Sequence, residues 1–146
     1  MSALSDNEIL SCLSQGILKI EPFNEKCLNP AGYDLRCAED LTIPPKTHAL
    51  AYSMEYIALP TSMIGILQIR SSLAREGVIG SFGFVDPGFR GQLTLQLFNS
   101  SSTPISIKKG ERIVQLVFIK LSSTPLRSYS GAYQDSRGVV LSKRKS

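Results

Sequence analysis

Short apolar segments alternate with turn-forming segments along most of the chain. The apolar segments are "ILKIEPF", "HALAYSMEYIAL", "MIGILQI", "LTLQLFN", "ISI" and "RIVQLVFIKL". Between them lie "NPAG", "IPPK", "DPG", "SSSTP" and "KKGE", which are rich in the residues that turns require. Many short strands at close spacing are typical of a β-sandwich or a small β-barrel. The pattern therefore predicts a mainly β protein.

The N-terminus has a different pattern. Ser5 is followed by Glu8 at the spacing of a capping box, and Ile9 and Leu13 then share one face before Gly16. A capping box ahead of a helical apolar face, with glycine after it, marks the two ends of a short helix. The sequence therefore predicts one N-terminal helix ahead of the strands.

From about Ser128 the chain loses its apolar periodicity. No linker, internal repeat or low-complexity segment divides the residues before it. A chain of 146 residues is an ordinary size for one domain with one core. We therefore expect one domain over residues 1–146, in which residues 128–146 form a tail that needs a surface to pack on.

The strand "QLTLQLFN" carries polar side chains on one face. Alternation places Leu93, Leu95 and Leu97 on one side, and Gln96 on the other side with Gln92, Thr94 and Phe98. The position of Gln96 is compatible with the wall of a pocket, and equally with plain exposure to solvent.

The net charge of +4 comes entirely from the last ten residues, which hold Arg137, Lys143, Arg144 and Lys145 and no acid. Such a tail is either a solvated end or an arm that reaches phosphate. Nucleic-acid binders more often spread basic residues over a folded face, so we expect no specific nucleic-acid binding.

Composition also bears on location. No apolar run approaches the ~20 residues of a membrane span, and the N-terminus lacks the pattern of a secretion signal, so we expect no membrane association. The three cysteines, Cys12, Cys27 and Cys37, have no metal-like spacing. We interpret them as buried thiols of a cytoplasmic protein.

Four clusters carry candidate chemistry. In "NPAGYDLR", Asp34 follows a turn and either caps backbone groups or faces a ligand. In "IRSSLAREGV", the side chains suited to phosphate oxygens are Arg70, Ser71, Ser72 and Arg75, although the segment also fits a surface turn.

The other two clusters lie further along the chain. "GFVDPGFRG" places Asp86 in a glycine-rich turn, where backbone groups can approach a planar ligand closely. In "KKGERIVQLVF", Gln115 interrupts an apolar strand and must find a polar partner. His48, the single histidine, is interpreted as structural, and any metal would have to arrive with the substrate.

In this order, the four clusters resemble motifs of the trimeric dUTPase and dCTP deaminase superfamily. The matching segments are "AGYDL", "RSSLA", "VDPGFRG" and "GERIVQL", and with the N-terminal "LSDNEIL" they span nearly the whole chain. The resemblance implies a dUTPase-like jelly roll or distorted β-barrel with a short N-terminal helix. It also implies a homotrimer with active sites at the subunit interfaces.

Two features separate the branches of the superfamily. Deaminases activate water with a glutamate on the strand after the DPG turn, where this chain has Gln96, and an amide has no useful pKa for proton transfer. The hairpin "EGVIGSFGFV" is also as short as in dUTPases. Both features favour hydrolysis of dUTP, although the N-terminal helix, Arg75 and the ending "YSGAYQDSRG" resemble the deaminase branch.

The resemblance implies a dUTP diphosphatase that forms dUMP and pyrophosphate. Asp86 would activate the attacking water, Phe89 would stack on deoxyribose, and Asp34 would support the site. Mg²⁺ would bind through the substrate phosphates, with no direct protein ligand. The substrate-binding residues would be Arg70, Ser71, Ser72, Arg75, Gly83, Phe84, Val85, Phe89, Gln115, Tyr133 and Gln134, with Arg137 helping to cover the ligand.

Three points remain open at this stage. The tail either covers the active site or simply packs on a neighbouring subunit. The chain is alternatively a dCTP deaminase, with or without dUTPase activity. The third interpretation is a non-catalytic nucleotide-binding regulator with the same fold.

Overall fold

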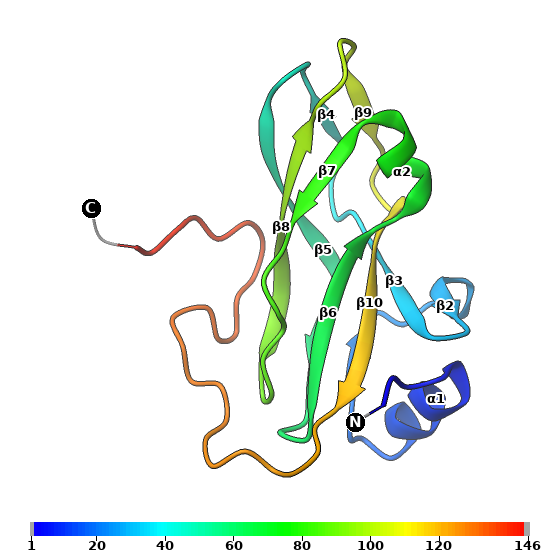
Figure 1. The fold of residues 1–146 in the computed structure, drawn as a ribbon, viewed down its shortest axis with the longest axis vertical. Coiled ribbons are helices and arrows are strands. Elements are labelled where there is room, and N and C mark those ends of the chain that lie inside the picture. Colours follow the sequence, from blue (N-terminus) through cyan, green and yellow to red (C-terminus); the bar gives the residue numbers. More distant parts are fainter. Residues whose placement is uncertain (1, 145–146) are drawn as a thin grey trace.

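Most of the regular structure of the protein consists of antiparallel strands around one core (Figure 1). The computed structural model describes residues 2–144. Its strands are β1 (Lys19–Glu21), β2 (Leu28–Asn29), β3 (Gly32–Arg36), β4 (Leu41–Ile43), β5 (His48–Ala58), β6 (Met63–Ile69), β7 (Val78–Ser81), β8 (Arg90–Asn99), β9 (Ile105–Ile107) and β10 (Arg112–Lys120). The helices are α1 (Asp6–Ser14), α2 (Ser71–Glu76) and the 3₁₀ turn η1 (Glu25–Cys27). The prediction of a mainly β fold with a short N-terminal helix is confirmed.

The strands form two four-stranded sheets and one two-stranded ribbon. One sheet has the order β1-β5-β8-β7, the other has the order β2-β3-β10-β6, and β4 pairs with β9. Apolar side chains from both sheets meet in one core, which includes Leu35, Ile57, Leu95, Leu116 and Phe118, all with no exposed surface. The six apolar segments predicted as strands contain β1, β5, β6, β9 and β10 and most of β8.

Helix α1 begins as the capping pattern predicts. The Ser5 hydroxyl accepts a hydrogen bond from the Glu8 N–H at 3.3 Å, and Ile9 is fully buried. Of the cysteines, Cys27 and Cys37 are buried, whereas Cys12 is only half-buried. Burial is the main cause that raises the pKa of both buried thiols. In residues 2–144 we find no helix that is long and apolar enough to span a membrane.

A bulge in β5 changes the register of its pairing with β8. Tyr52 is opposite Thr94, but Tyr56 is opposite Gln92, so β5 holds two extra residues. The buried Ser53 hydroxyl donates to the Glu55 carbonyl at 2.8 Å and accepts from the Leu93 N–H at 2.9 Å. These bonds satisfy groups that the bulge removes from the ladder. The bulge lies beside the part of β8 that lines the candidate site.

One buried ion pair ties β3 to β5. The fully buried Glu55 carboxylate accepts from Arg36 Nε at 2.7 Å, from the Arg36 N–H at 3.0 Å and from the Tyr33 hydroxyl at 3.2 Å. Burial, followed by the charge of Glu55, strongly raises the pKa of Tyr33, which keeps its hydroxyl protonated as a donor. The carboxylate is therefore held by three donors, as a buried charge requires.

Candidate active site

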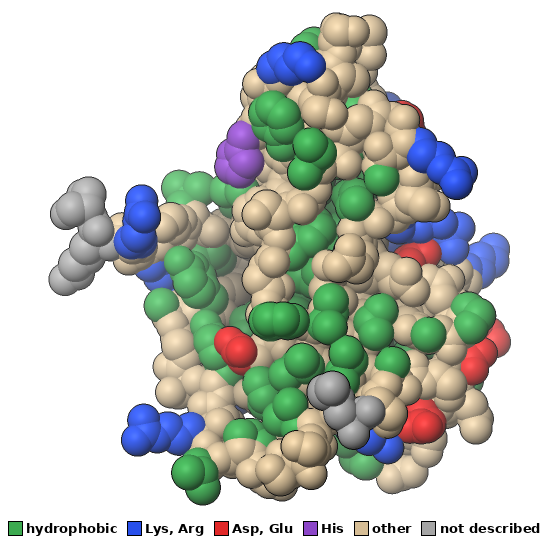
Figure 2. Space-filling view, in the orientation of Figure 1, with side chains coloured by type: hydrophobic (Ala, Val, Ile, Leu, Met, Phe, Trp, Pro, Cys, Tyr) green, Lys and Arg blue, Asp and Glu red, His purple; other side chains and the backbone are tan. Residues whose placement is uncertain are grey.

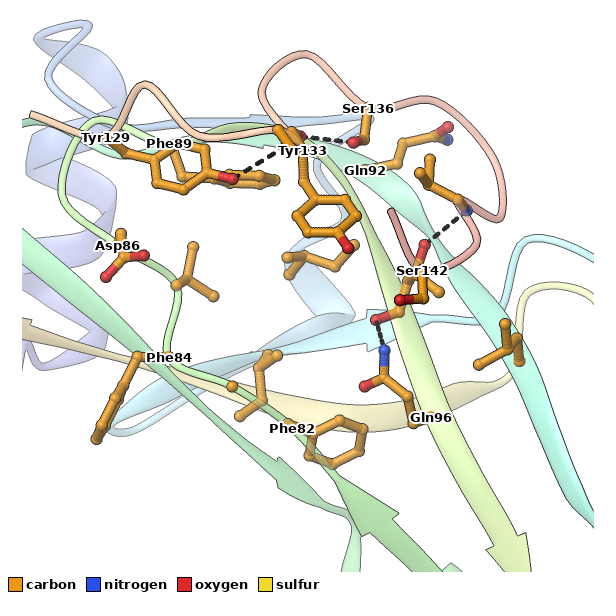
Figure 3. A pocket seen from close by; sticks show the side chains of 18 of the residues that line it. Phe82, Phe84, Asp86, Phe89, Gln92, Gln96, Tyr129, Tyr133, Ser136 and Ser142 are labelled. Carbon is orange, nitrogen blue, oxygen red and sulfur yellow. Dashed lines mark hydrogen bonds between the residues drawn. The ribbon is translucent and has the colours of Figure 1, made fainter. Parts of the chain in front are cut away.

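A cavity of about 700 Å³ opens between β8, residues 82–89 and the C-terminal tail (Figure 3). Its size is that of a small-molecule site. The lining side chains are His48, Leu50, Leu67, Phe82, Phe84, Val85, Asp86, Phe89, Gln92, Leu93, Thr94, Gln96, Tyr129, Ala132, Tyr133, Ser136, Val140 and Ser142, together with Gly83. Among the lining residues that the structure describes, Asp86 is the only carboxylate.

The turn that carries Asp86 is fixed by backbone bonds to β6. Val85 and Gly65 exchange two N–H···O bonds of 2.8 Å, and Val85 is buried. The next residue, Asp86, is exposed toward the cavity, and the Phe89 N–H donates to its carbonyl at 3.1 Å. The rigid strand β6 therefore places this carboxylate at the cavity wall.

We predict that Gly65→Ala displaces this turn. A β-carbon at Gly65 would lie 2.7 Å from Leu116 Cδ1 and 3.0 Å from Val85 Cβ. Overpacking of this kind costs about 1–3 kcal/mol, which urea unfolding will measure. Gly83→Ala is the matched control, because a β-carbon there meets no atom within 4 Å. Equal unfolding free energies for the two variants would contradict the prediction.

Aromatic rings surround the Asp86 end of the cavity. Phe89 and Tyr129 meet edge to face with their ring centroids 5.6 Å apart, and the Phe89 side chain is only 7% exposed. Phe84 lies on the opposite side of Asp86 and is 69% exposed (Figure 3). Aromatic walls around a few polar groups suit a flat, partly polar ring such as a pyrimidine.

Gln96 lines the cavity rather than facing open solvent. Its amide donates to the Thr94 carbonyl at 3.3 Å, and it lies at the opposite end of the cavity from Asp86 (Figure 3). The neighbouring Leu95 and Leu97 are fully buried, as alternation predicts. Leu93 departs from that pattern, since it reaches the cavity beside the β5 bulge.

A second group of predicted site residues lies outside this cavity. Asp34 is 2% exposed and accepts from Asn29 Nδ2 at 2.7 Å. It also forms ion pairs of 3.1 Å with Arg70 Nε and 3.6 Å with Arg112 Nη1. Gln115 is directly opposite Asp34 in the pairing of β10 with β3. Asp34 thus holds two guanidinium groups in place, and sequence reasoning did not select Arg112.

The predicted phosphate-binding serines follow Arg70 on α2. Ser71, Ser72 and Arg75 are exposed, whereas Leu73 is buried. The sequence did not predict this six-residue helix. None of the residues named around Asp34 and on α2 lines the cavity around Asp86, so the two groups are separate within one chain.

The three predicted tail residues have different positions. Tyr133 points into the cavity (Figure 3). Gln134 instead fastens the tail, because its amide donates to the Gly88 carbonyl at 3.0 Å and accepts from the Arg90 N–H at 2.7 Å. The Arg137 guanidinium lies 4.2 Å from the centroid of the Tyr56 ring.

The basic end of the tail is described as far as residue 144. The Lys143 ammonium donates to the Ala132 carbonyl and lies 5.6 Å from the centroid of the Tyr133 ring. The predicted cation at Lys145 lies outside the described residues.

The donor set bears on the predicted magnesium ion. The Asp34 carboxylate already accepts a hydrogen bond from Asn29 and forms ion pairs with Arg70 and Arg112. Mg²⁺ is commonly held by one or two carboxylates and substrate phosphates. In this arrangement Asp34 is therefore engaged by these three partners rather than open to a metal ion.

Comparison with known proteins identifies the family. A dCTP deaminase-like family model matches residues 37–121. The chain is 48% identical to a dCTP deaminase of Pyrococcus horikoshii, over 86% of this chain and 90% of that protein. The chain belongs to the dCTP deaminase-like family. It is also 36% identical to a dUMP-forming dCTP deaminase of Aquifex aeolicus, over 96% of this chain and 93% of that protein.

The fold extends beyond the dCTP deaminase-like family. A structure of the dUTPase of Staphylococcus bacteriophage 80alpha superimposes with a TM-score of 0.61 at 20% identity, covering 78% of this chain and 97% of that one. This likeness confirms the predicted dUTPase-like fold. The predicted superfamily is confirmed by the family model and the dCTP deaminase relatives together with this fold.

The relatives overturn the activity predicted from Gln96. The prediction was a dUTP diphosphatase, but the curated relatives that are about half identical to this chain are named dCTP deaminases. The dUTPase likeness is structural and at low identity, so it reports the fold alone. The error was to treat the Gln96 amide as decisive for the reaction, against the N-terminal helix, Arg75 and the ending "YSGAYQDSRG", which resemble the deaminase branch. The dCTP deaminase alternative is therefore the better-supported activity.

Proposed function

We propose that this protein is a dCTP deaminase, which converts dCTP and water to dUTP and ammonia. The observation that carries the proposal is a carboxylate, Asp86, in a cavity walled by aromatic rings, within a chain about half identical to proteins named dCTP deaminase. The exchange of an amino group for a carbonyl oxygen needs a water molecule, a proton acceptor and a proton donor beside C4 of cytosine.

In this proposal Asp86 moves the proton. Its carboxylate takes a proton from water as the oxygen bonds to C4, and delivers that proton to N3. It then takes the proton of the new C4 hydroxyl and delivers it to the amino group, so that the C4–N bond breaks, ammonia leaves and the C4 carbonyl forms. Gln96 has an amide that neither accepts nor releases a proton near neutral pH. The rings of Phe84, Phe89 and Tyr129 exclude bulk water and hold the base flat beside the carboxylate. Phe89 also remains the predicted contact of the deoxyribose.

The triphosphate is bound, in this proposal, by a second copy of the chain. Arg70 and Arg112 are oriented by Asp34, and with Ser71 and Ser72 they form a cationic, hydroxyl-rich group suited to phosphate oxygens. Because that group is separate from the Asp86 cavity within one chain, a site between subunits of a homotrimer would unite them. Figure 2 shows apolar side chains gathered on the face that carries the tail, and Ile79 and Phe84, 54% and 69% exposed, would be covered in such an assembly.

A second candidate is a deaminase that also releases pyrophosphate and forms dUMP. The similarity to the dUMP-forming dCTP deaminase of Aquifex aeolicus, which spans 96% of this chain, favours it. Both candidates begin with loss of ammonia from dCTP, and they differ only in whether the triphosphate survives.

The test is incubation of the full chain with dCTP and Mg²⁺, with ammonia and nucleotides quantified together. We expect one ammonia for each dCTP consumed, with dUTP as the product. Accumulation of dUMP and pyrophosphate in equal amounts would establish the second candidate. Consumption of dCTP without ammonia, or no consumption at all, would refute both.

We predict that Gln96→Ala retains deamination within about tenfold of the unaltered protein, because an amide is not the proton-transfer group. Initial rates of ammonia release at saturating dCTP measure this effect. A loss of a thousandfold or more in Gln96→Ala would place the chemistry at residue 96 and contradict the role given to Asp86.

A further inference from the structure

The tail occupies a part of β8 that β7 leaves unpaired. β7 pairs with Gln96–Asn99, at the second half of β8. Along the first half, Ser136 forms a parallel bridge with Gly91. The Gln92 N–H donates to the Ser136 carbonyl at 2.8 Å, and the Asp135 N–H donates to the Arg90 carbonyl at 2.7 Å. The tail therefore extends the sheet at an edge that would otherwise be open.

Gly91 allows this close approach. Its φ is +152°, and a β-carbon there would lie 2.9 Å from the backbone nitrogen of Ser136. Any other residue would force the tail away from β8. The sequence of β8 is thus compatible with a tail that lies directly against it.

Side chains outside the cavity fasten this contact. Arg90 Nε and Nη2 donate to the two Asp135 carboxylate oxygens, each at 3.0 Å, and the Tyr56 hydroxyl donates to Asp135 Oδ1 at 2.9 Å. Two parallel N–H···O bonds fix orientation as well as distance. The Arg90 guanidinium, followed by the Tyr56 hydroxyl, lowers the pKa of the Asp135 carboxyl. Asp135 has a φ of +59°, which aspartate and asparagine tolerate better than most residues.

The contact continues toward the cavity. The Gly138 N–H donates to Gln92 Oε1 at 2.7 Å, and the Val140 N–H donates to Thr94 Oγ1 at 3.0 Å. Ser136 and Val140 both line the cavity. The ion pair at Asp135 therefore lies where the tail runs along β8, between Tyr133 and Ser136, which both line the cavity.

We propose that the contacts of Arg90 and Tyr56 with Asp135 form a latch, which keeps the tail in place as a wall of the cavity before any nucleotide binds. These three are positioning residues, since none of them lines the cavity around Asp86. A wall that is already ordered spares the nucleotide the entropic cost of ordering it, so the latch strengthens nucleotide binding. The effect on dCTP rests on the proposed function, whereas the effect on the tail does not.

Amide hydrogen exchange of the nucleotide-free protein tests the latch directly. We expect Asp135→Asn and Arg90→Gln each to speed exchange at Gly138 and Val140 by about three- to tenfold, the scale of a well-oriented exposed pair. Arg90→Lys, which keeps the charge but loses the two-pronged contact, should fall between these variants and the unaltered protein. Unchanged exchange at Gly138 and Val140, or an equal increase throughout the core, would overturn the proposal.

Glu8→Gln is the matched control. It removes the Lys120–Glu8 pair, whose side chains are 49% and 50% exposed, as those of Arg90 and Asp135 are 51% and 56% exposed. This control should leave exchange in the tail unchanged. The double variant Arg90→Gln/Asp135→Asn should resemble each single variant, because the two residues act through one contact. Additive effects in the double variant would contradict a shared latch.

Steady-state kinetics and thermal unfolding then distinguish an effect on nucleotide binding from a general loss of stability. We expect the latch variants to raise KM for dCTP about three- to tenfold with kcat unchanged, and to leave the thermal midpoint within about 2 °C of the unaltered protein. Faster exchange with an unchanged KM would overturn the effect on binding. Absence of ammonia release from the unaltered protein would refute the deaminase proposal instead, and the exchange result would still decide whether the latch exists.

Discussion

Asp86→Asn should lower the rate of ammonia release from dCTP by at least about 10²–10⁴-fold, the usual contribution of a positioned acid–base group. The substitution keeps the size and shape of the side chain but removes its ability to exchange a proton. The turn itself should persist, because Val85 is fixed to Gly65 by two backbone bonds of 2.8 Å. Initial rates at saturating dCTP measure the effect.

The binding of dCTP provides the control for this variant. If Asp86 acts in proton transfer, calorimetric titration of Asp86→Asn should give a Kd within about tenfold of that of the unaltered protein, while kcat collapses. Gln96→Ala, in contrast, should keep kcat for ammonia release within about tenfold of that of the unaltered protein. An Asp86→Asn protein that deaminates dCTP within tenfold of the normal rate would contradict the assignment.

Arg36→Met should destabilise the fold by about 3–5 kcal/mol, because it leaves the Glu55 carboxylate buried without its cation. Glu55 has no exposed surface, and Arg36 Nε donates to it at 2.7 Å. Arg36 Nη2 also donates to the Pro22 carbonyl at 2.6 Å, so the substitution releases the segment that follows β1 as well. Urea unfolding at a fixed protein concentration measures the loss.

The double variant Arg36→Met/Glu55→Gln tests whether buried charge is the cause. An amide at residue 55 can still accept from the backbone N–H of residue 36 through its oxygen and can donate through its NH2 group to the Tyr33 hydroxyl oxygen, but it carries no charge that needs compensation. We therefore expect the double variant to recover at least half of the stability that Arg36→Met loses. A double variant less stable than Arg36→Met would show that lost packing, rather than an unpaired charge, sets the cost.

Local sequence patterns predicted the strands with alternating side chains and the start of the N-terminal helix. Period-two alternation marked β5, β6 and β10, and the Ser5–Glu8 spacing marked the start of α1. Helix α2 escaped prediction because six residues that begin with two serines carry too little apolar periodicity. Strand β4 also escaped prediction, because its three residues are followed directly by two prolines and the whole segment has the composition of a turn.

The candidate site depended on contacts that local patterns do not encode. The turn with Asp86 was selected from its glycine-rich composition and lines the cavity, and its catalytic role stays a prediction. The pairing of Asp34 with Arg112 instead follows from the register of β3 and β10. The β5 bulge, beside which Leu93 lines the cavity, also arises from strand pairing. The ordered motifs predicted the superfamily correctly, because its two branches share them. They did not decide the reaction, and too much weight was given to Gln96.

The most direct measurement is the position of the solvent oxygen after reaction of dCTP in H₂¹⁸O. Deamination inserts one water oxygen at C4 of the base, so mass spectrometry of the product nucleoside should show a gain of one ¹⁸O in the uracil ring, matched by one ammonia released. Asp86→Asn should lose this label together with the ammonia. A product whose ¹⁸O lies only on phosphate, with cytosine intact, would contradict the account.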